Sequence, residues 1–148
     1  MPKKILNIFI SQPMHGRDEK DILGERELIM HYLNTINPYK KTWELKLIDN
    51  LHHEARTWDY LPPERAARLY NLGQSVSQMA DADLVIFAKG WSDAAGCAIE
   101  KVIATSYGIL AFNVWDLGVE VIADGYLRAA MANKNKWRYK KNGKEPED

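Results

Sequence analysis

Residues 5–13 read Ile5-Leu6-Asn7-Ile8-Phe9-Ile10-Ser11-Gln12-Pro13. The first six residues are nearly all apolar and rich in β-formers, and the polar run that follows ends at a proline. A segment that is apolar on both faces is typical of a strand buried in the middle of a parallel sheet. This stretch therefore predicts a central strand over Ile5–Ile10 that opens into a polar loop at its carboxyl end.

Strand-like and helix-like segments alternate along the rest of the chain. Three more strands are predicted at Trp43–Leu47, Leu84–Ala88 and Ile109–Val114. Helices are predicted at residues 18–34, 63–80, 96–107 and 119–131. Alternation at this spacing is typical of βαβ units, so we expect one doubly wound, Rossmann-like α/β domain with a parallel sheet of about four or five strands. We expect that domain to span residues 1–132 and residues 133–148 to form a charged, frayed or solvated tail.

Three of the predicted helices carry an apolar stripe that we expect to face the sheet. The stripes consist of Ile22, Ile29, Leu33 and Ile36 in the first helix, Ala67, Tyr70, Val76 and Met79 in the second, and Ile99, Val102, Ile103 and Ser106 in the third.

The composition narrows the class of partner. The 148 residues include 20 basic and 20 acidic side chains, so the formal net charge is zero. Such a surface offers no electrostatic footprint for a nucleic-acid polymer or an anionic membrane. The single cysteine, Cys97, excludes an internal disulfide and a zinc site built on paired cysteines. The sequence shows neither a signal peptide nor a membrane span, so we expect a cytoplasmic protein. The balanced charge favours a small molecule or another protein as its partner.

The predicted topology confines the search for chemistry. In open α/β sheets, ligands bind beyond the carboxyl ends of the strands. Four segments lie there: Ser11–Arg17, which we call the first loop, Asp49–His53, Lys89–Gly96, which we call the second loop, and Trp115–Gly118.

The first loop reads Ser11-Gln12-Pro13-Met14-His15-Gly16-Arg17. It offers a hydroxyl, an amide, a cation and the N-terminus of the next helix, which together suit a phosphate or a sugar hydroxyl. It fits neither a Walker loop nor GxGxxG. The alternative is a plain strand-to-helix turn in which proline and glycine serve geometry alone.

The second loop leads into a helix through small residues: Gly90-Trp91-Ser92-Asp93-Ala94-Ala95-Gly96-Cys97-Ala98-Ile99-Glu100. Small side chains let a ligand approach the backbone, and Glu100 lies about one turn into the helix. Its carboxylate is expected to point at the ligand edge. The alternative is a glutamate placed to complement the helix dipole.

Three segments, in this order, resemble the nucleoside 2-deoxyribosyltransferase-like superfamily, and specifically a branch common in bacteria and phages. They are Phe9-Ile10-Ser11-Gln12-Pro13-Met14-His15-Gly16, Ala80-Asp81-Ala82-Asp83-Leu84-Val85, and Gly96-Cys97-x-x-Glu100. The resemblance covers roughly residues 5–113. It implies that Glu100 attacks the anomeric carbon of a nucleoside or nucleotide, that the base leaves, and that water or a second base resolves the glycosyl-enzyme.

The same resemblance implies roles for the loops. The first loop would hold the sugar or a 5′-phosphate, with Arg17 as the phosphate contact. Trp91 would either stack on the base or cover the sheet edge, and Gly96 would allow close approach of the substrate. No metal or organic cofactor is implied, because the carboxylate performs the difficult step.

One position departs from the family pattern. Members usually carry an aspartate eight residues before the one that opens the strand matching Leu84–Ala88, and counting back from Asp83 lands on Ser75. A serine hydroxyl does not ionise near neutral pH, so Ser75 cannot donate the proton that the leaving base needs. This departure leaves three alternatives. Asp93 could supply the proton, the base could need no proton, or the activity could have drifted so far that turnover is lost. In the last case the chain is a non-catalytic nucleotide-binding protein.

Other polar and aromatic residues receive weaker assignments. His52 and His53 are adjacent and point different ways, which makes a poor metal pair. Cys97 is interpreted as a small buried hydrophobe at a tight helix start. Trp58 and Tyr60 suit packing or subunit contacts, and we expect a homo-oligomer, as in homologous enzymes.

Overall fold

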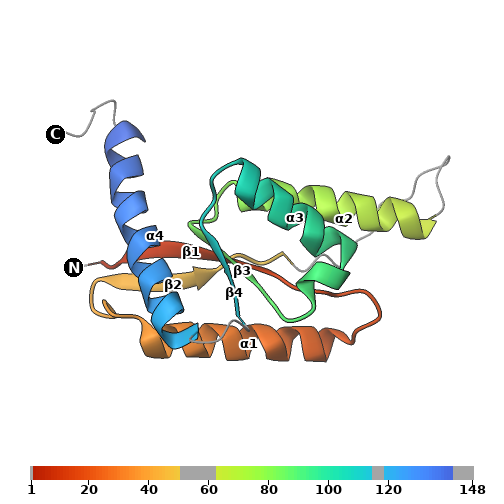
Figure 1. Ribbon diagram of the computed structural model, residues 1–148, viewed down its shortest axis with the longest axis horizontal. Helices are drawn as coiled ribbons and strands as arrows, with labels where there is room; N and C mark the ends of the chain where they lie inside the picture. The colour runs from red at the N-terminus through yellow and green to blue at the C-terminus, as the bar shows by residue number, and fades with distance from the viewer. Residues whose placement is uncertain (1, 51–62, 115–118, 142–148) are drawn as a thin grey trace.

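The computed structural model describes residues 2–50, 63–114 and 119–141. Figure 1 shows one parallel sheet with helices on both sides. Four strands form the sheet in the order β2-β1-β3-β4. They are β1 (Lys4–Ser11), β2 (Trp43–Leu47), β3 (Leu84–Phe87) and β4 (Ala111–Asn113). The predicted doubly wound α/β fold with a parallel sheet of about four or five strands is confirmed, and the described residues form four strands.

The predicted central strand, β1, lies between two parallel neighbours. Ile8 is opposite Leu84 of β3, and Ser11 is opposite Phe87 at the carboxyl end of the same pair. On its other side β1 pairs with β2 from Lys4 to Ile8. Its residues from Ile8 to Ser11 are fully buried, as expected for a strand covered on both faces.

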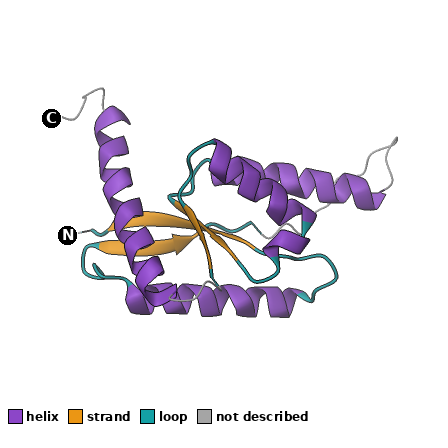
Figure 2. Cartoon of the chain, viewed as in Figure 1, coloured by secondary structure: helices purple, strands orange, loops and turns teal. Residues whose placement is uncertain are grey.

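Two helices cover each face of the sheet (Figure 2). On one face, α1 (Glu19–Ile36) and α4 (Val119–Lys141) pack the larger core cluster against β1, β2 and β3. On the other face, α2 (Pro63–Met79) and α3 (Ala95–Ser106) cover Phe9, Val85 and Phe87. A short 3₁₀ turn, η1 (Trp91–Asp93), leads into α3. None of the described helices is long and apolar enough to cross a membrane.

The predicted inward face of α3 is correct at Ile103, which is half-buried and packs on the core, and wrong at its other three positions. Ile99 and Val102 are 45% and 64% exposed, and Ser106 is exposed as well. The buried residues of α3 are Cys97, Glu100 and Ala104, whose spacing forms a different stripe of the same helix. The apolar pattern pointed to the wrong stripe because this helix exposes several of its large apolar side chains and buries a carboxylate.

The predicted face of α2 is partly wrong. Met79 is buried as expected, but the other buried positions are Ala66 and Ser75. Ala67 and Val76, one residue further along, are only half-buried. The predicted stripe was thus displaced by one residue over most of the helix. Small residues, which carry little hydrophobic signal, occupy the inner positions.

The C-terminal segment is more ordered than predicted. The sequence pattern ends the last helix at Met131, whereas α4 continues to Lys141. Lys134 fixes this extension, since its Nζ lies 2.8 Å from Asp83 Oδ2 and donates to the Ile5 carbonyl at 2.6 Å. The prediction of a frayed tail is therefore wrong up to Lys141, where α4 ends, and the tertiary ion pair of Lys134 is a contact that a local pattern does not reveal.

Candidate active site

The first and second loops meet at the carboxyl edge of the sheet. The Ala88 backbone N–H donates to the Ser11 carbonyl at 2.9 Å, which extends the β1–β3 pairing into the loops. Gly90 has a φ of +85°, in the region that favours glycine, and a β-carbon built on it would lie 3.6 Å from Pro13 Cγ. The two loops singled out from the sequence thus come together in space.

Glu100 lies on the inner face of α3 and is only 6% exposed. Its Oε1 accepts a hydrogen bond from Ser11 Oγ at 3.3 Å. Its Oε2 is buried and has no hydrogen-bond partner among the described residues. Burial raises the pKa of Glu100 to about 7, and the Ser11 hydrogen bond opposes part of that rise. A buried carboxylate with one free oxygen is a candidate for chemistry at neutral pH.

Cys97 shares this inner face and is 3% exposed. Burial raises the pKa of its thiol to about 11; a side-chain hydrogen bond with Ser11 opposes the rise, and the nearby Glu100 carboxylate adds to it. The thiol is therefore protonated at neutral pH, and a protonated thiol is a poor nucleophile. Cys97 belongs to the packing of α3.

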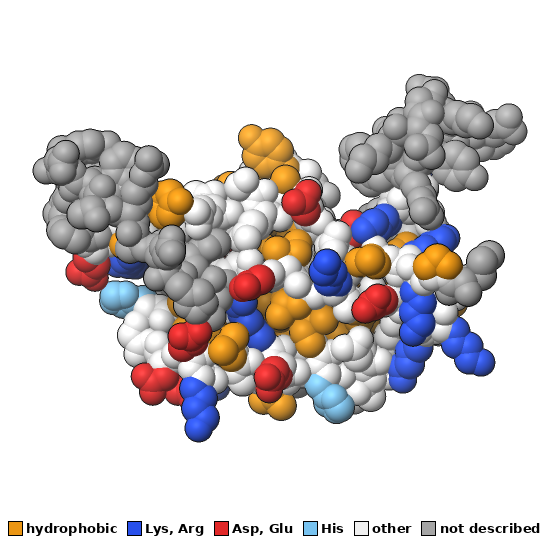
Figure 3. Space-filling view, turned by 180° about the vertical axis from the view of Figure 1, so that it is seen from behind, with side chains coloured by type: hydrophobic (Ala, Val, Ile, Leu, Met, Phe, Trp, Pro, Cys, Tyr) orange, Lys and Arg blue, Asp and Glu red, His pale blue; other side chains and the backbone are white. Residues whose placement is uncertain are grey.

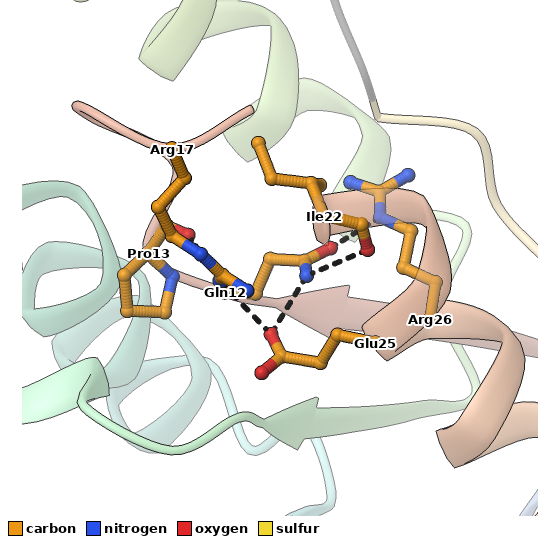
Figure 4. Close-up of polar contacts among 6 residues, drawn as sticks. All are labelled: Gln12, Pro13, Arg17, Ile22, Glu25 and Arg26. Atoms are coloured by element: carbon orange, nitrogen blue, oxygen red, sulfur yellow. Dashed lines mark hydrogen bonds and ion pairs between the residues drawn. The ribbon is translucent and has the colours of Figure 1, made fainter. Parts of the chain in front are cut away.

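Gln12 is directed into the protein and is 4% exposed (Figure 4). Its Nε2 donates to the Ile22 carbonyl at 3.2 Å and to Glu25 Oε1 at 2.8 Å. Its Oε1 accepts a hydrogen bond from Arg26 Nε. Donor and acceptor are both engaged by α1, so the Gln12 side chain fixes the first loop on that helix.

Arg17 is also tied to the first loop and α1. Its NH1 donates to the Pro13 carbonyl at 2.8 Å and lies 3.1 Å from Glu25 Oε1. Met14 is half-buried, and its carbonyl accepts from the Arg17 backbone N–H at 3.1 Å. The tip of the turn consists of His15 and Gly16, which are exposed, and Gly16 has a φ of +75°.

Arg26 is a buried cation beneath the first loop, and it is 2% exposed. Burial lowers its pKa from the usual value, while Asp49 opposes the change. The nearest Arg26–Asp49 distance is 4.0 Å, and the Asp49 side chain is mostly exposed. This contact brings the start of the predicted Asp49–His53 segment to the same edge.

Two asparagines at this edge were not singled out from the sequence, although Asn50 lies in the predicted Asp49–His53 segment. Asn50 is 2% exposed; its Nδ2 donates to the Ile10 carbonyl at 3.0 Å, while its Oδ1 is without a partner among the described residues. Asn113 ends β4 opposite Phe87, and its buried Oδ1 is likewise unpartnered there. Their position at or just after a strand end was the available signal.

The second loop carries an aromatic contact at the end of β3. The Phe87 and Trp91 rings have centroids 5.4 Å apart. Lys101 Nζ lies 5.0 Å from the Phe87 centroid and 5.6 Å from that of Trp91. Trp91 is half-buried and packs on Phe87, so it covers the end of β3. Covering the sheet edge was one of the two roles predicted for it; the other was stacking on a base.

The remaining predicted residues differ in exposure. Asp93 is exposed in η1, and its backbone N–H donates to the Gly90 carbonyl at 3.1 Å. Gly96 is half-buried, and a β-carbon built on it would lie 3.8 Å from Leu72 Cδ1 of α2. Ser75 is buried in α2, on the same side as Met79.

Several predictions fall on residues outside those that the structure describes. They concern His52, His53, Trp58, Tyr60 and the segment 115–118.

Comparisons of the chain with protein-family models, curated proteins and solved structures found no match. What the molecule itself presents is a Rossmann-like α/β domain with a buried glutamate at the carboxyl edge of its sheet.

Proposed function

We propose that the protein cleaves or transfers the N-glycosidic bond of a nucleoside, a deoxynucleoside or a nucleoside 5′-monophosphate. Glu100 is the nucleophile in this proposal. The observation that carries it is the Glu100 carboxylate itself, which is buried at the carboxyl edge of the sheet with Oε1 bonded to Ser11 and Oε2 unpartnered. The resemblance of the surrounding motifs to the deoxyribosyltransferase-like superfamily supports this assignment.

The reaction has two steps. In the first, a Glu100 oxygen forms a bond to the anomeric carbon, and the C–N bond breaks with its electron pair going to the base. In the second, water or another base attacks the anomeric carbon and releases the carboxylate. Burial favours both steps, because a site with little water strengthens the attraction between the carboxylate and an oxocarbenium-like centre.

The protonation state of Glu100 fits this role near neutral pH. With a pKa of about 7, roughly half of the molecules carry the ionised nucleophile at pH 7. The Ser11 hydroxyl donates to Oε1 and so stabilises the ionised form. Ser11 therefore acts as a positioning residue that leaves Oε2 for the substrate.

Protonation of the leaving base is assigned to Asp93. It is exposed in the middle of the second loop, where water can return its proton. Trp91 and Gly96 lie in the same loop region, and the first loop, Ser11–Arg17, supplies the sugar side of the site. Ser75 remains a candidate hydrogen-bond partner for the base. No metal or organic cofactor enters this scheme.

The second candidate is a non-catalytic nucleotide-binding protein. Ser75 favours it, because serine stands where catalytic members of the superfamily carry an acid. Both candidates use a small-molecule partner. Acidic and basic side chains share the face in Figure 3, around apolar side chains near its centre, which agrees with a partner other than a polyanion. A cytoplasmic homo-oligomer is part of the same proposal.

One experiment separates the two candidates. The protein is incubated with a panel of nucleosides, deoxynucleosides and their 5′-monophosphates, and free base is followed by chromatography. We expect base release that is lost in Glu100→Gln and retained in Glu27→Gln, a matched change at an exposed position of α1. Tight binding without release would favour the non-catalytic protein. Release that persists in Glu100→Gln would refute the assignment of the nucleophile.

A further inference from the structure

The start of α1 has more acidic than basic side chains. Residues 17–26 contain three basic residues and four acidic ones, a formal charge of −1. The basic residues are Arg17, Lys20 and Arg26, and the acidic ones are Asp18, Glu19, Asp21 and Glu25. Asp18 is the N-cap, and Glu19 and Asp21 lie in the first turn. These carboxylates compensate the partial positive charge of the helix N-terminus, which is the charge that would otherwise attract a phosphate.

Arg17, the cation expected to contact a phosphate, already has an anionic partner. Its NH1 lies 3.1 Å from Glu25 Oε1 and also donates to the Pro13 carbonyl at 2.8 Å. The Arg17 and Glu25 side chains are 30% and 24% exposed. Glu25 is itself held in place by Gln12 Nε2 at 2.8 Å, so the ion pair is part of the network in Figure 4.

The other nearby cations differ in how they are held. Lys20, near the start of α1, is exposed. Arg26 is buried beneath the first loop, where its Nε bonds to Gln12 and its NH1 lies 4.0 Å from Asp49 Oδ1, while its buried NH2 has no hydrogen-bond partner among the described residues. Lys101 lies over the rings of Phe87 and Trp91 in the second loop region.

We propose that Glu25 determines substrate specificity by neutralising the charge of Arg17. The preferred substrate is then an unphosphorylated nucleoside, an inference that rests on the proposed function. A 5′-phosphate carries close to two negative charges at neutral pH, and at this edge it would meet Glu25, the first turn of α1 and the Glu100 carboxylate. A neutral 5′-hydroxyl incurs no such repulsion.

The test compares one deoxynucleoside with its own 5′-monophosphate. On wild-type protein we expect kcat/KM for base release to favour the nucleoside by about tenfold or more, because like charges oppose binding of the phosphate. Added salt should raise kcat/KM for the monophosphate and leave that for the nucleoside nearly unchanged.

Variants then test whether Glu25 causes the preference for the nucleoside over its monophosphate. Glu25→Gln keeps an oxygen acceptor for Gln12 and Arg17 but removes the charge, and we expect it to raise the monophosphate-to-nucleoside ratio of kcat/KM by about threefold or more. Asp21→Asn, an exposed change in the first turn of α1, should shift the ratio the same way to a smaller extent. Glu27→Gln, on the exposed side of α1, is the matched control and should leave the ratio unchanged.

The outcomes distinguish this inference from the function on which it rests. Equal or faster release from the monophosphate by wild-type protein would overturn the inference and leave the glycosidase proposal standing. An unchanged ratio in Glu25→Gln would overturn the role of Glu25. No release from any member of the panel would overturn the proposed function itself.

Discussion

Ser11 Oγ donates a hydrogen bond to Glu100 Oε1 at 3.3 Å, and the two residues are 89 positions apart in the chain. One side chain comes from the end of β1 and the other from the second turn of α3. The contact exists because β1 and β3 are neighbours in the sheet, which places the loops that follow them at one edge. It is also the only hydrogen bond of the Glu100 carboxylate among the described residues.

Ser11→Ala should raise the pKa of Glu100 further above about 7, because it removes the hydrogen bond that favours the ionised form. The midpoint of the acid limb in the pH profile of kcat/KM should move to higher pH by the same amount. The measurement is the rate of base release between pH 5 and 9. Ser106→Ala, an exposed change in α3, is the control. An identical profile in Ser11→Ala would contradict the contact.

Glu100→Gln should stabilise the protein at alkaline pH. The pKa of Glu100 rises from its usual 4.5 to about 7, so between these values the folded protein binds more protons than the unfolded chain. Stability therefore falls as pH rises through that window, by about 1.4 kcal/mol per pH unit. We expect Glu100→Gln to unfold in urea much like wild type near pH 4.5 and to be more stable by roughly 2–3 kcal/mol at pH 8.

Glu27→Gln provides the baseline for that comparison, since Glu27 is exposed on α1. A difference between wild type and Glu100→Gln that stayed constant with pH would show that Glu100 ionises normally.

Gln12→Ala should destabilise the fold strongly. The substitution removes three hydrogen bonds and leaves buried Arg26 Nε and Glu25 with one partner fewer each. We expect a loss of about 2–4 kcal/mol in the free energy of unfolding, measured by urea denaturation. Gln74→Ala, which removes one partly buried hydrogen bond to Tyr70, should lose only about 1 kcal/mol. Equal losses would contradict the role assigned to Gln12.

Cys97 should resist thiol reagents in the native protein. Its thiol is 3% exposed, and its pKa of about 11 leaves roughly one molecule in a thousand ionised at pH 8. Because Cys97 is the only cysteine, the reaction with a chromogenic disulfide reports this site alone. We expect slow labelling in buffer and complete labelling in urea. Labelling as fast in buffer as in urea would mean that α3 does not cover the thiol.

The parts of the structure with a strong local signal were predictable. The strands around Ile8 and Ile86 are short apolar runs, and the ligand edge follows from parallel topology once those strands are recognised. The inner face of α3 was not predictable, because Ile99 and Val102 look like core residues and Glu100 looks like a surface residue. The stripe that faces the sheet consists of Cys97, Glu100 and Ala104, and the apolar pattern of the helix does not reveal it.

The network beneath the first loop was hidden for a different reason. Gln12 bonds to Glu25 and Arg26, whose charged side chains suggest solvent exposure, although position 26 lies on the apolar stripe of α1 between Ile22 and Ile29. Their burial depends on how closely α1 approaches the first loop, and a hydrophobic pattern carries no information about that distance. Asn50 and Asn113 went unnoticed because an amide at a strand end has no distinctive signature.

The position of β1 has a consequence for how the chain reaches its folded form. β1 precedes both of its partners along the chain, and its pairing with β3 must wait until Leu84–Phe87 has been synthesised. Until then one edge of an apolar strand is unpaired, which is a state prone to aggregation and slow to resolve, because distant segments must find each other. Since Ser11 meets Glu100 only after this step, a ligand that contacts Glu100 would stabilise only the molecules that have completed it.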